Sequence, residues 1–151
     1  MSEHVHPVHA EVAVIDFGSQ YTQLIARRLR DVGVFSQIYP FNRYEEVLGR
    51  PEVKGIVLSG GPSSVSDEGA PDVGDDIFNA GVPILGICYG MQLCCKKLGG
   101  SIEASDSREY GPARMSIVAS SDPFFEGISE SQGVWMSHGD RVEKLPAGFQ
   151  R

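Results

Sequence analysis

Apolar residues in the first hundred positions fall into short continuous runs, separated by segments with helical spacing. Short apolar runs that end at glycine or proline predict buried strands, and apolar positions that recur every three to four residues predict helices. Strands that alternate with helices need helical crossovers and form a parallel sheet. We therefore predict an α/β fold, with a flavodoxin-like, doubly wound, mainly parallel sheet and helices on both faces. The predicted strands are 11–17, 34–39, 55–58 and 83–87, and the predicted helices are 21–32, 44–48, 72–79 and 89–98.

The pattern changes after residue 100, where turn residues become frequent and helical signals become few. Residues 113–119, 133–137 and 141–145 have the composition of short strands. We expect these strands to be antiparallel additions at one end of the sheet.

The first ten residues are polar and contain three of the four histidines, His4, His6 and His9. Histidine clusters can bind metals, but polar chain ends of this kind are usually disordered. We therefore expect a disordered tail at 1–10, no metal site, and one domain over 11–151.

The bulk composition excludes several classes of partner. The chain has 151 residues and a formal net charge of −7, so a basic nucleic-acid surface is not expected. No apolar stretch approaches the roughly 20 residues of a membrane span, and the first ten residues have no signal-peptide core. Three cysteines do not make a disulfide framework, and the adjacent Cys94 and Cys95 fit the apolar side of a helix. A reducing cytoplasm is the expected compartment.

Cys88 lies where an apolar strand must turn sharply into a helix. Gly86 and Gly90 flank it and form Gly-x-Cys-x-Gly, the cysteine version of a nucleophile elbow, in which small neighbours let the turn close. The positive end of the following helix favours a thiolate and can lower the pKa of Cys88. The alternative interpretation is a buried cysteine without a chemical role.

Two further segments carry candidate chemistry. The strand that ends at Leu58 leads into Ser59-Gly-Gly-Pro62, whose unshielded N–H groups can stabilise an oxyanion together with the N–H of Tyr89. Such a loop can also be a glycine turn selected only for its backbone angles. Residues 136–140 contain His138, which could be a base for Cys88 or a loop histidine.

Four segments together resemble the class I, or triad, glutamine amidotransferases, and among them the amidotransferase domains of the GMP synthetase family. The resemblance implies that Cys88 is the nucleophile that forms a γ-glutamyl thioester. It also implies that Gly61 and Tyr89 supply oxyanion N–H groups and that Gln92 holds the α-amino acid end of glutamine. It places Ser137, His138, Gly139 and Asp140 in a loop that borders the same pocket. The segments that carry the resemblance are 16–25, 57–63, 86–92 and 135–140.

For such a domain the resemblance implies hydrolysis of L-glutamine to glutamate and ammonia, with no cofactor bound to the domain itself. The ammonia would pass to an ATP-pyrophosphatase (synthetase) domain or subunit, where ATP and Mg²⁺ bind and XMP is aminated to GMP. The resemblance further implies a homo-oligomer for the full protein.

The chain departs from the family pattern in two respects. The family's base is a histidine in a His-x-Glu motif downstream of the Ser-His-Gly-Asp loop, and no such motif follows that loop here. The Ser-Gly-Gly-x-Asp-Ser motif of the synthetase domain does not occur either. We therefore expect a domain without its C-terminal segment. Loss of a general base costs about 10²–10⁴-fold, so we expect little glutaminase activity from this chain alone.

Two other functions remain open on the sequence. PfpI-like cysteine hydrolases and chaperones share the elbow and the sheet, but would not explain Gln92 or the loop at 137–140. A catalytically inert docking subunit would explain the missing His-x-Glu motif.

Overall fold

The computed structural model describes residues 10–118 and 121–151, without the side chains of residues 105–109 and 138. Of the tail predicted at 1–10, only Ala10 lies within the described residues. The last residue of the strand predicted at 113–119 also lies outside them.

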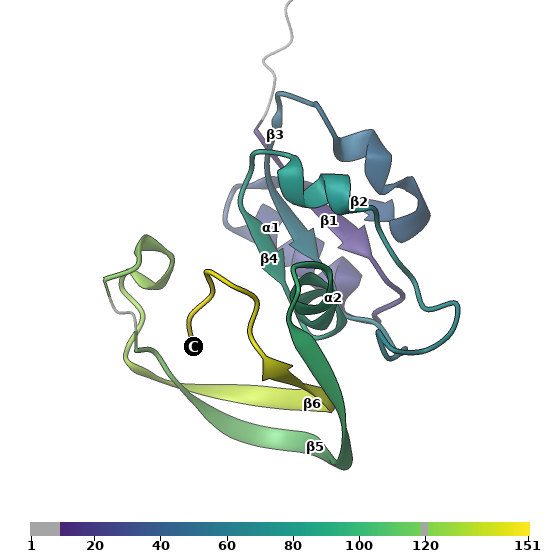
Figure 1. The fold of residues 1–151 in the computed structure, drawn as a ribbon. Coiled ribbons are helices and arrows are strands. Elements are labelled where there is room, and N and C mark those ends of the chain that lie inside the picture. Colours follow the sequence, from purple (N-terminus) through teal and green to yellow (C-terminus); the bar gives the residue numbers. More distant parts are fainter. Residues whose placement is uncertain (1–9, 119–120) are drawn as a thin grey trace, which may run out of the picture.

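Residues 11–86 contain a four-stranded parallel sheet (Figure 1). Its strands lie in the order β2-β1-β3-β4, and every neighbouring pair is parallel. This order and the crossover helices confirm the predicted flavodoxin-like fold. The strand bounds are β1 Glu11–Asp16, β2 Phe35–Pro40, β3 Val53–Leu58 and β4 Ile84–Gly86.

Helices cover both faces of the sheet because side chains alternate between the faces along each buried strand. Helix α1, Thr22–Asp31, packs its Ala26 against Val14 of β1 and Val57 of β3. On the opposite face, the core contains Ile15, Leu58 and Leu93, the last from helix α2, Tyr89–Lys97. Two 3₁₀ helices, η1 Phe41–Val47 and η2 Asp75–Asn79, pack on the same face as α2.

Both short helices differ from their predicted bounds. The helix predicted at 72–79 begins only at Asp75, because Gly74 has extended backbone angles of φ −68 and ψ 160. The helix predicted at 44–48 begins earlier, at Phe41, and is interrupted by the non-helical Arg43.

The strands after residue 100 form a separate two-stranded antiparallel sheet, and the expectation that they extend the parallel sheet is wrong. Strand β5 covers Ser101–Ser116 and strand β6 covers Ser131–Lys144, with the 3₁₀ helix η3, Pro123–Phe125, between them. The antiparallel pairing itself is confirmed. The strands predicted at 133–137 and 141–145 are one strand, since pairing with β5 continues along both. We call β5 and β6 the ribbon.

The base of the ribbon is attached to α2 through Cys95. The Cys95 thiol lies 3.3 Å from the carbonyl oxygen of Lys144 and 3.9 Å from that of Ser101. Gly100 has to be glycine at this point, because a β-carbon there would lie 2.4 Å from the Cys95 sulfur. The apolar role predicted for Cys95 therefore includes contact with both strands at the base of the ribbon.

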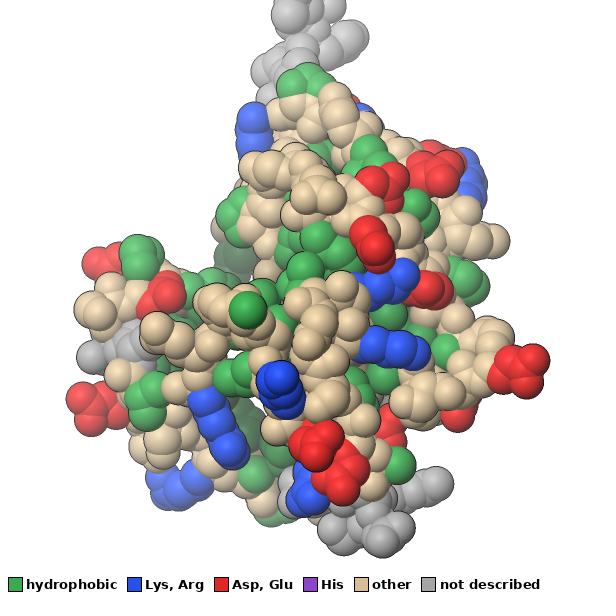
Figure 2. All heavy atoms as spheres, viewed as in Figure 1, with side chains coloured by type: hydrophobic (Ala, Val, Ile, Leu, Met, Phe, Trp, Pro, Cys, Tyr) green, Lys and Arg blue, Asp and Glu red, His purple; other side chains and the backbone are tan. Residues whose placement is uncertain are grey.

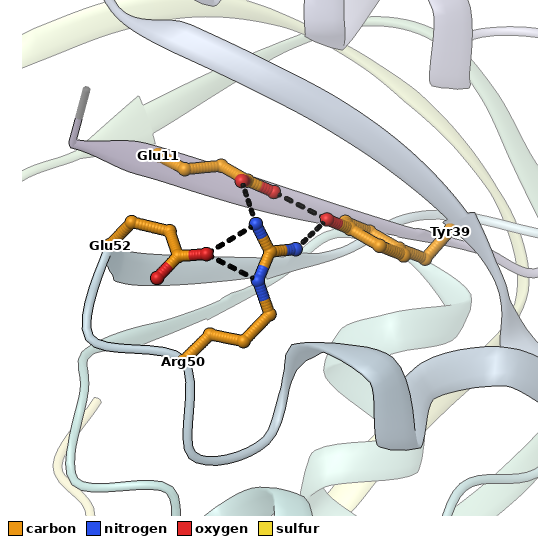
Figure 3. A network of polar contacts seen from close by, with 4 residues as sticks. All are labelled: Glu11, Tyr39, Arg50 and Glu52. Carbon is orange, nitrogen blue, oxygen red and sulfur yellow. Dashed lines mark hydrogen bonds and ion pairs between the residues drawn. The ribbon is translucent and has the colours of Figure 1, made fainter. Parts of the chain in front are cut away.

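A polar network closes the amino end of the parallel sheet (Figure 3). Glu11 is 1% exposed and forms an ion pair with Arg50 at 3.0 Å. Tyr39 donates to Glu11 at 2.7 Å, and Arg50 also contacts Glu52 at 2.7 Å. The carboxyl ends of the strands, at the opposite edge, carry the segments with candidate chemistry.

The surface agrees with the acidic but mixed composition. Acidic and basic side chains are interspersed on the face drawn in Figure 2, and no block of one sign dominates it. Within the described ranges, no helix has both the length and the apolar character that a membrane span needs.

Candidate functional site

A cavity of about 680 Å³ opens at the carboxyl ends of β1, β3 and β4. The crossovers from β1 and β3 leave the sheet on opposite faces, which makes this edge the usual position of a ligand crevice in a flavodoxin-like fold. The loops after all three strands line the cavity, and the ribbon supplies its remaining wall. Its lining includes Gly18, Gly60, Gly61, Cys88, Gln92 and Asp140.

Cys88 occupies a strained turn between β4 and α2. Its backbone angles are φ 50 and ψ −113, and it is the one non-glycine residue with positive φ in the described part of the chain. Strain of this kind costs about 1–3 kcal/mol and persists only where the surroundings impose it. The predicted elbow is therefore present, and it holds the thiol at the cavity wall.

The two flanking glycines are required by close backbone approaches. A β-carbon on Gly90 would lie 2.1 Å from the carbonyl oxygen of Leu58, and one on Gly86 would lie 2.6 Å from Cα of Met91. The Gly90 N–H also donates to the Ser59 carbonyl at 3.0 Å. The first turn of α2 thus packs directly on the end of β3, which brings Cys88 to the glycine loop.

The pKa of the Cys88 thiol differs from the expectation. Burial of the side chain raises its pKa, whereas the helix N-terminus alone predicted a lowered one. Desolvation disfavours the charged thiolate, and it is the cause that governs the shift here. Burial also raises the pKa of Cys94, to about 11.

The loop after β3 lies directly beside Cys88. A β-carbon on Gly60 would lie 3.6 Å from Cβ of Cys88, and one on Gly61 would lie 2.6 Å from the carbonyl oxygen of Phe17. The N–H groups of Gly61 and Tyr89 donate to no acceptor in residues 10–118 and 121–151. Tyr89 is fixed by its ring, which packs 5.2 Å from the Phe17 ring and hydrogen-bonds the Pro71 carbonyl. Both expected donors therefore border the cavity without a competing partner.

Buried hydroxyls support this loop from beneath. Ser59 is fully buried, and its Oγ accepts a hydrogen bond from the Phe17 N–H at 3.3 Å. Thr22 lies beside it at 3.2 Å and donates to Asp16 at 2.8 Å. These side chains connect the ends of β1 and β3 with the first turn of α1.

Residues 137–140, expected as a loop, are part of strand β6, and the ribbon reaches the cavity through Ser137, Gly139 and Asp140. Gln92 donates from Nε2 to the carbonyl oxygen of Asp140 at 3.1 Å, and Ser64 donates to the Asp140 carboxylate at 2.5 Å. Ser137 and Gly139 line the cavity. The side chain of His138 lies outside the described part of the structure, so the hypothesis that it is a base for Cys88 is not tested.

Sequence reasoning assigned no role to several lining residues. Ser19, Gln20 and Tyr21 follow β1 and line the cavity. In the sequence, their only signal is that they belong to segment 16–25, which resembles the family. Tyr110 of β5 also lines it, and no local pattern marks that residue, because only the β5–β6 pairing brings it there. Among the residues that the structure describes, no group of three or more His, Cys, Asp or Glu side chains could hold a metal ion.

Residues 13–151 match the family described as glutamine amidotransferase class-I. The chain belongs to the class-I glutamine amidotransferases. Curated relatives of this amidotransferase sequence carry the name GMP synthase [glutamine-hydrolyzing]. The protein from Zymomonas mobilis is 52% identical over 147 residues, and the one from Rhodopseudomonas palustris is 50% identical over 152 residues. These matches cover 95% and 99% of the chain, but each covers 28% of the relative, so the chain spans little more than a quarter of their length.

Solved structures agree with this assignment. A Thermoplasma acidophilum protein described as a GMP synthase subunit superposes with a TM-score of 0.79 and is 32% identical. That match covers 94% of the chain and 71% of the neighbour. A glutamine amidotransferase from Thermotoga maritima superposes with a TM-score of 0.68 at 25% identity, over 92% of the chain and 64% of the neighbour.

Proposed function

We propose that this amidotransferase hydrolyses the side-chain amide of L-glutamine, with Cys88 as the nucleophile. The observation that supports it best is the strained Cys88 elbow beside a glycine loop, where the N–H groups of Gly61 and Tyr89 have no other acceptor among the described residues. Burial disfavours charged groups at this site, including the free thiolate. N–H donors that are already in place therefore matter more for stabilising the oxyanion in the transition state.

In the proposed reaction, the Cys88 sulfur attacks Cδ of glutamine, the carbonyl carbon of its side-chain amide, and the carbonyl π electrons move onto oxygen. The N–H groups of Gly61 and Tyr89 stabilise that oxyanion. When it collapses, the C–N bond breaks and the nitrogen takes up a proton and leaves as ammonia. Water then attacks the thioester, which releases glutamate and restores the thiol. The resemblance assigns the proton transfers to a His-x-Glu histidine.

The polar wall of the cavity fits the amino-acid end of the substrate. Gln92 is 5% exposed and its amide N–H₂ is held by Asp140, while its Oε1 receives no hydrogen bond from a described residue. No buried side-chain polar atom in the described part lacks a partner, so this oxygen reaches the open cavity. We assign it to the α-amino group of glutamine, and we assign Ser137, His138, Gly139 and Asp140 to the border of the same subsite.

The names of the relatives support a wider role. We propose that the domain covering 11–151 supplies ammonia to an ATP-pyrophosphatase domain or subunit that aminates XMP to GMP in the cytoplasm. ATP and Mg²⁺ would bind on that partner and not on this domain, and the full protein would be a homo-oligomer. The match to GMP synthases over 27–28% of their length leaves room in those relatives for such a domain.

The test is covalent labelling of Cys88 with a reactive glutamine analogue, such as an L-glutamine chloroketone analogue, and peptide mapping by mass spectrometry. We expect labelling at Cys88 that millimolar L-glutamine suppresses and that D-glutamine does not. Cys88→Ser should remove the label, and Cys95→Ser is the matched control that keeps it. Equal labelling with and without L-glutamine would contradict the proposal and favour another cysteine hydrolase or an inert domain.

A further inference from the structure

A buried polar network lies beneath the glycine loop, and no step of the proposed hydrolysis uses it. Thr22 Oγ1 is 2.8 Å from Asp16 Oδ1 and 3.2 Å from Ser59 Oγ. Ser59 Oγ is also 3.1 Å from the carbonyl oxygen of Gly60. Ser59 is fully buried and Thr22 is 1% exposed, so neither hydroxyl can exchange its partners for water.

The acceptor of the Ser59 hydroxyl proton follows from the donors and acceptors around it. Each hydroxyl has one proton, and a carboxylate is the strongest acceptor available, so Thr22 donates to Asp16. Ser59 Oγ accepts the N–H of Phe17 at 3.3 Å. Its own proton then goes to the carbonyl oxygen of Gly60 at 3.1 Å, which is nearer than the other available acceptor, Thr22 Oγ1 at 3.2 Å.

The Gly60 carbonyl and the Gly61 N–H belong to one peptide unit. In a trans peptide these two groups point in opposite directions, and the described residues contain no cis peptide. Because Ser59 holds the carbonyl toward the buried layer, the N–H of Gly61 points to the other side, where both glycines line the cavity beside Cys88.

A peptide between two glycines needs such a support. Glycine populates far more of φ/ψ space than other residues, so the Gly60–Gly61 peptide has little intrinsic preference for one orientation. If it rotated by half a turn, it would present a carbonyl oxygen to the oxyanion in place of an N–H. That change would turn an attraction into a repulsion.

We propose that Ser59 is a positioning residue for the amidase reaction. Held by Thr22 and Asp16, it fixes the Gly60–Gly61 peptide so that the Gly61 N–H meets the oxyanion. The inference rests on the proposed function, because it assumes that an oxyanion forms on the substrate of Cys88.

Two reactions of the same thiol separate this role from a general structural one. Acylation of Cys88 by the p-nitrophenyl γ-ester of L-glutamate passes through a tetrahedral oxyanion, whereas alkylation by iodoacetamide displaces iodide and forms none. Loss of one oxyanion donor costs on the order of 10²–10³-fold in rate. For Ser59→Ala, where the donor is misdirected and not removed, we expect acylation to slow by about 10- to 100-fold. Alkylation should stay within about twofold of the parent chain.

Thr22 provides the second pair of variants. Thr22→Val removes the hydroxyl with little change of shape and should slow acylation severalfold, whereas Thr22→Ser should restore the parent rate. This pair also tests the proposal if Ser59→Ala does not fold.

The outcomes are distinguishable. Unchanged acylation in Ser59→Ala and Thr22→Val, or an equal loss of acylation and alkylation in both, would overturn the positioning role. A parent chain that iodoacetamide alkylates but the ester does not acylate, even at a pH where the Cys88 thiolate forms without a base, would overturn the proposed function, and the positioning role with it.

Discussion

Gln92 of α2 donates a hydrogen bond to the main-chain carbonyl of Asp140 in β6, across 48 residues of sequence and 3.1 Å of space. Gln92 lies one helical turn beyond the Cys88 elbow, so this bond connects the helix of the proposed nucleophile with the ribbon wall of the cavity. Three residues further along α2, Cys95 contacts the Lys144 carbonyl of the same strand. One face of α2 therefore holds β6 in place.

Replacing Gln92 with leucine should loosen the ribbon at the cavity. The Asp140 carbonyl would lose its partner in a part-buried position, which costs about 1–3 kcal/mol of the free energy of unfolding. We expect faster amide hydrogen exchange around 137–141 and a lower denaturation midpoint. Gln132→Leu is the matched control, since Gln132 also donates to a carbonyl, that of Ser129, but at an exposed position. Equal protection of 137–141 in parent and Gln92→Leu would show that the bond does not hold the ribbon.

Replacing Gly90 with alanine should disrupt the elbow. The new β-carbon would lie 2.1 Å from the Leu58 carbonyl, so α2 has to move away from the end of β3. We expect a loss of about 1–3 kcal/mol in the free energy of unfolding and slower acylation of Cys88. In Gly133→Ala the added carbon has no neighbour within 4 Å, and stability should change by no more than about 0.5 kcal/mol. Similar effects of the two substitutions would contradict the close packing at Gly90.

Removing the cation from the network at the amino end of the sheet should be costly. Arg50→Met leaves the carboxylate of Glu11, which is 1% exposed, without its ion-pair partner, and this typically costs about 3–5 kcal/mol. The double variant Glu11→Gln with Arg50→Met should recover part of that loss, because no buried charge remains.

The control for Arg50 is an exposed ion pair elsewhere in the chain. Arg28 and Asp31 are 75% and 49% exposed, so Arg28→Met should change the free energy of unfolding by less than about 1 kcal/mol. Chemical denaturation of the four proteins gives the comparison. A double variant less stable than Arg50→Met would argue against an uncompensated charge as the cause.

Alkylation of Cys88 should depend on pH as expected for a thiol with a raised pKa. Burial raises the pKa, so at a given pH a smaller fraction is thiolate than in a free cysteine, whose pKa is about 8.5. The rate with iodoacetamide should rise about tenfold per pH unit through neutral pH and reach half its maximum above pH 8.5. Cys94, with a pKa of about 11, should react only at still higher pH. A rate at Cys88 that is already constant at pH 7 would show that the thiolate is stabilised.

The strands and helices of the parallel sheet, the elbow and the family could all be predicted from the amino-acid sequence alone. Each is marked by a pattern that extends over only a few neighbouring residues. Buried strands and amphipathic helices follow from local periodicity, and Gly86, Cys88 and Gly90 form a turn whose geometry is local. The same reasoning failed for residues 101–144, because a two-stranded ribbon and an added sheet edge have the same local pattern and differ only in their partners.

The surroundings of these groups depend instead on the packing of distant segments. The sign of the Cys88 pKa shift depends on burial, which many segments produce together, and a helix N-terminus alone predicted the opposite sign. The Gln92–Asp140 bond and the Asp16–Thr22–Ser59 network join residues between 6 and 48 positions apart. Short-range patterns set which residues are available for the chemistry, whereas desolvation and hydrogen-bond partners are set by long-range packing.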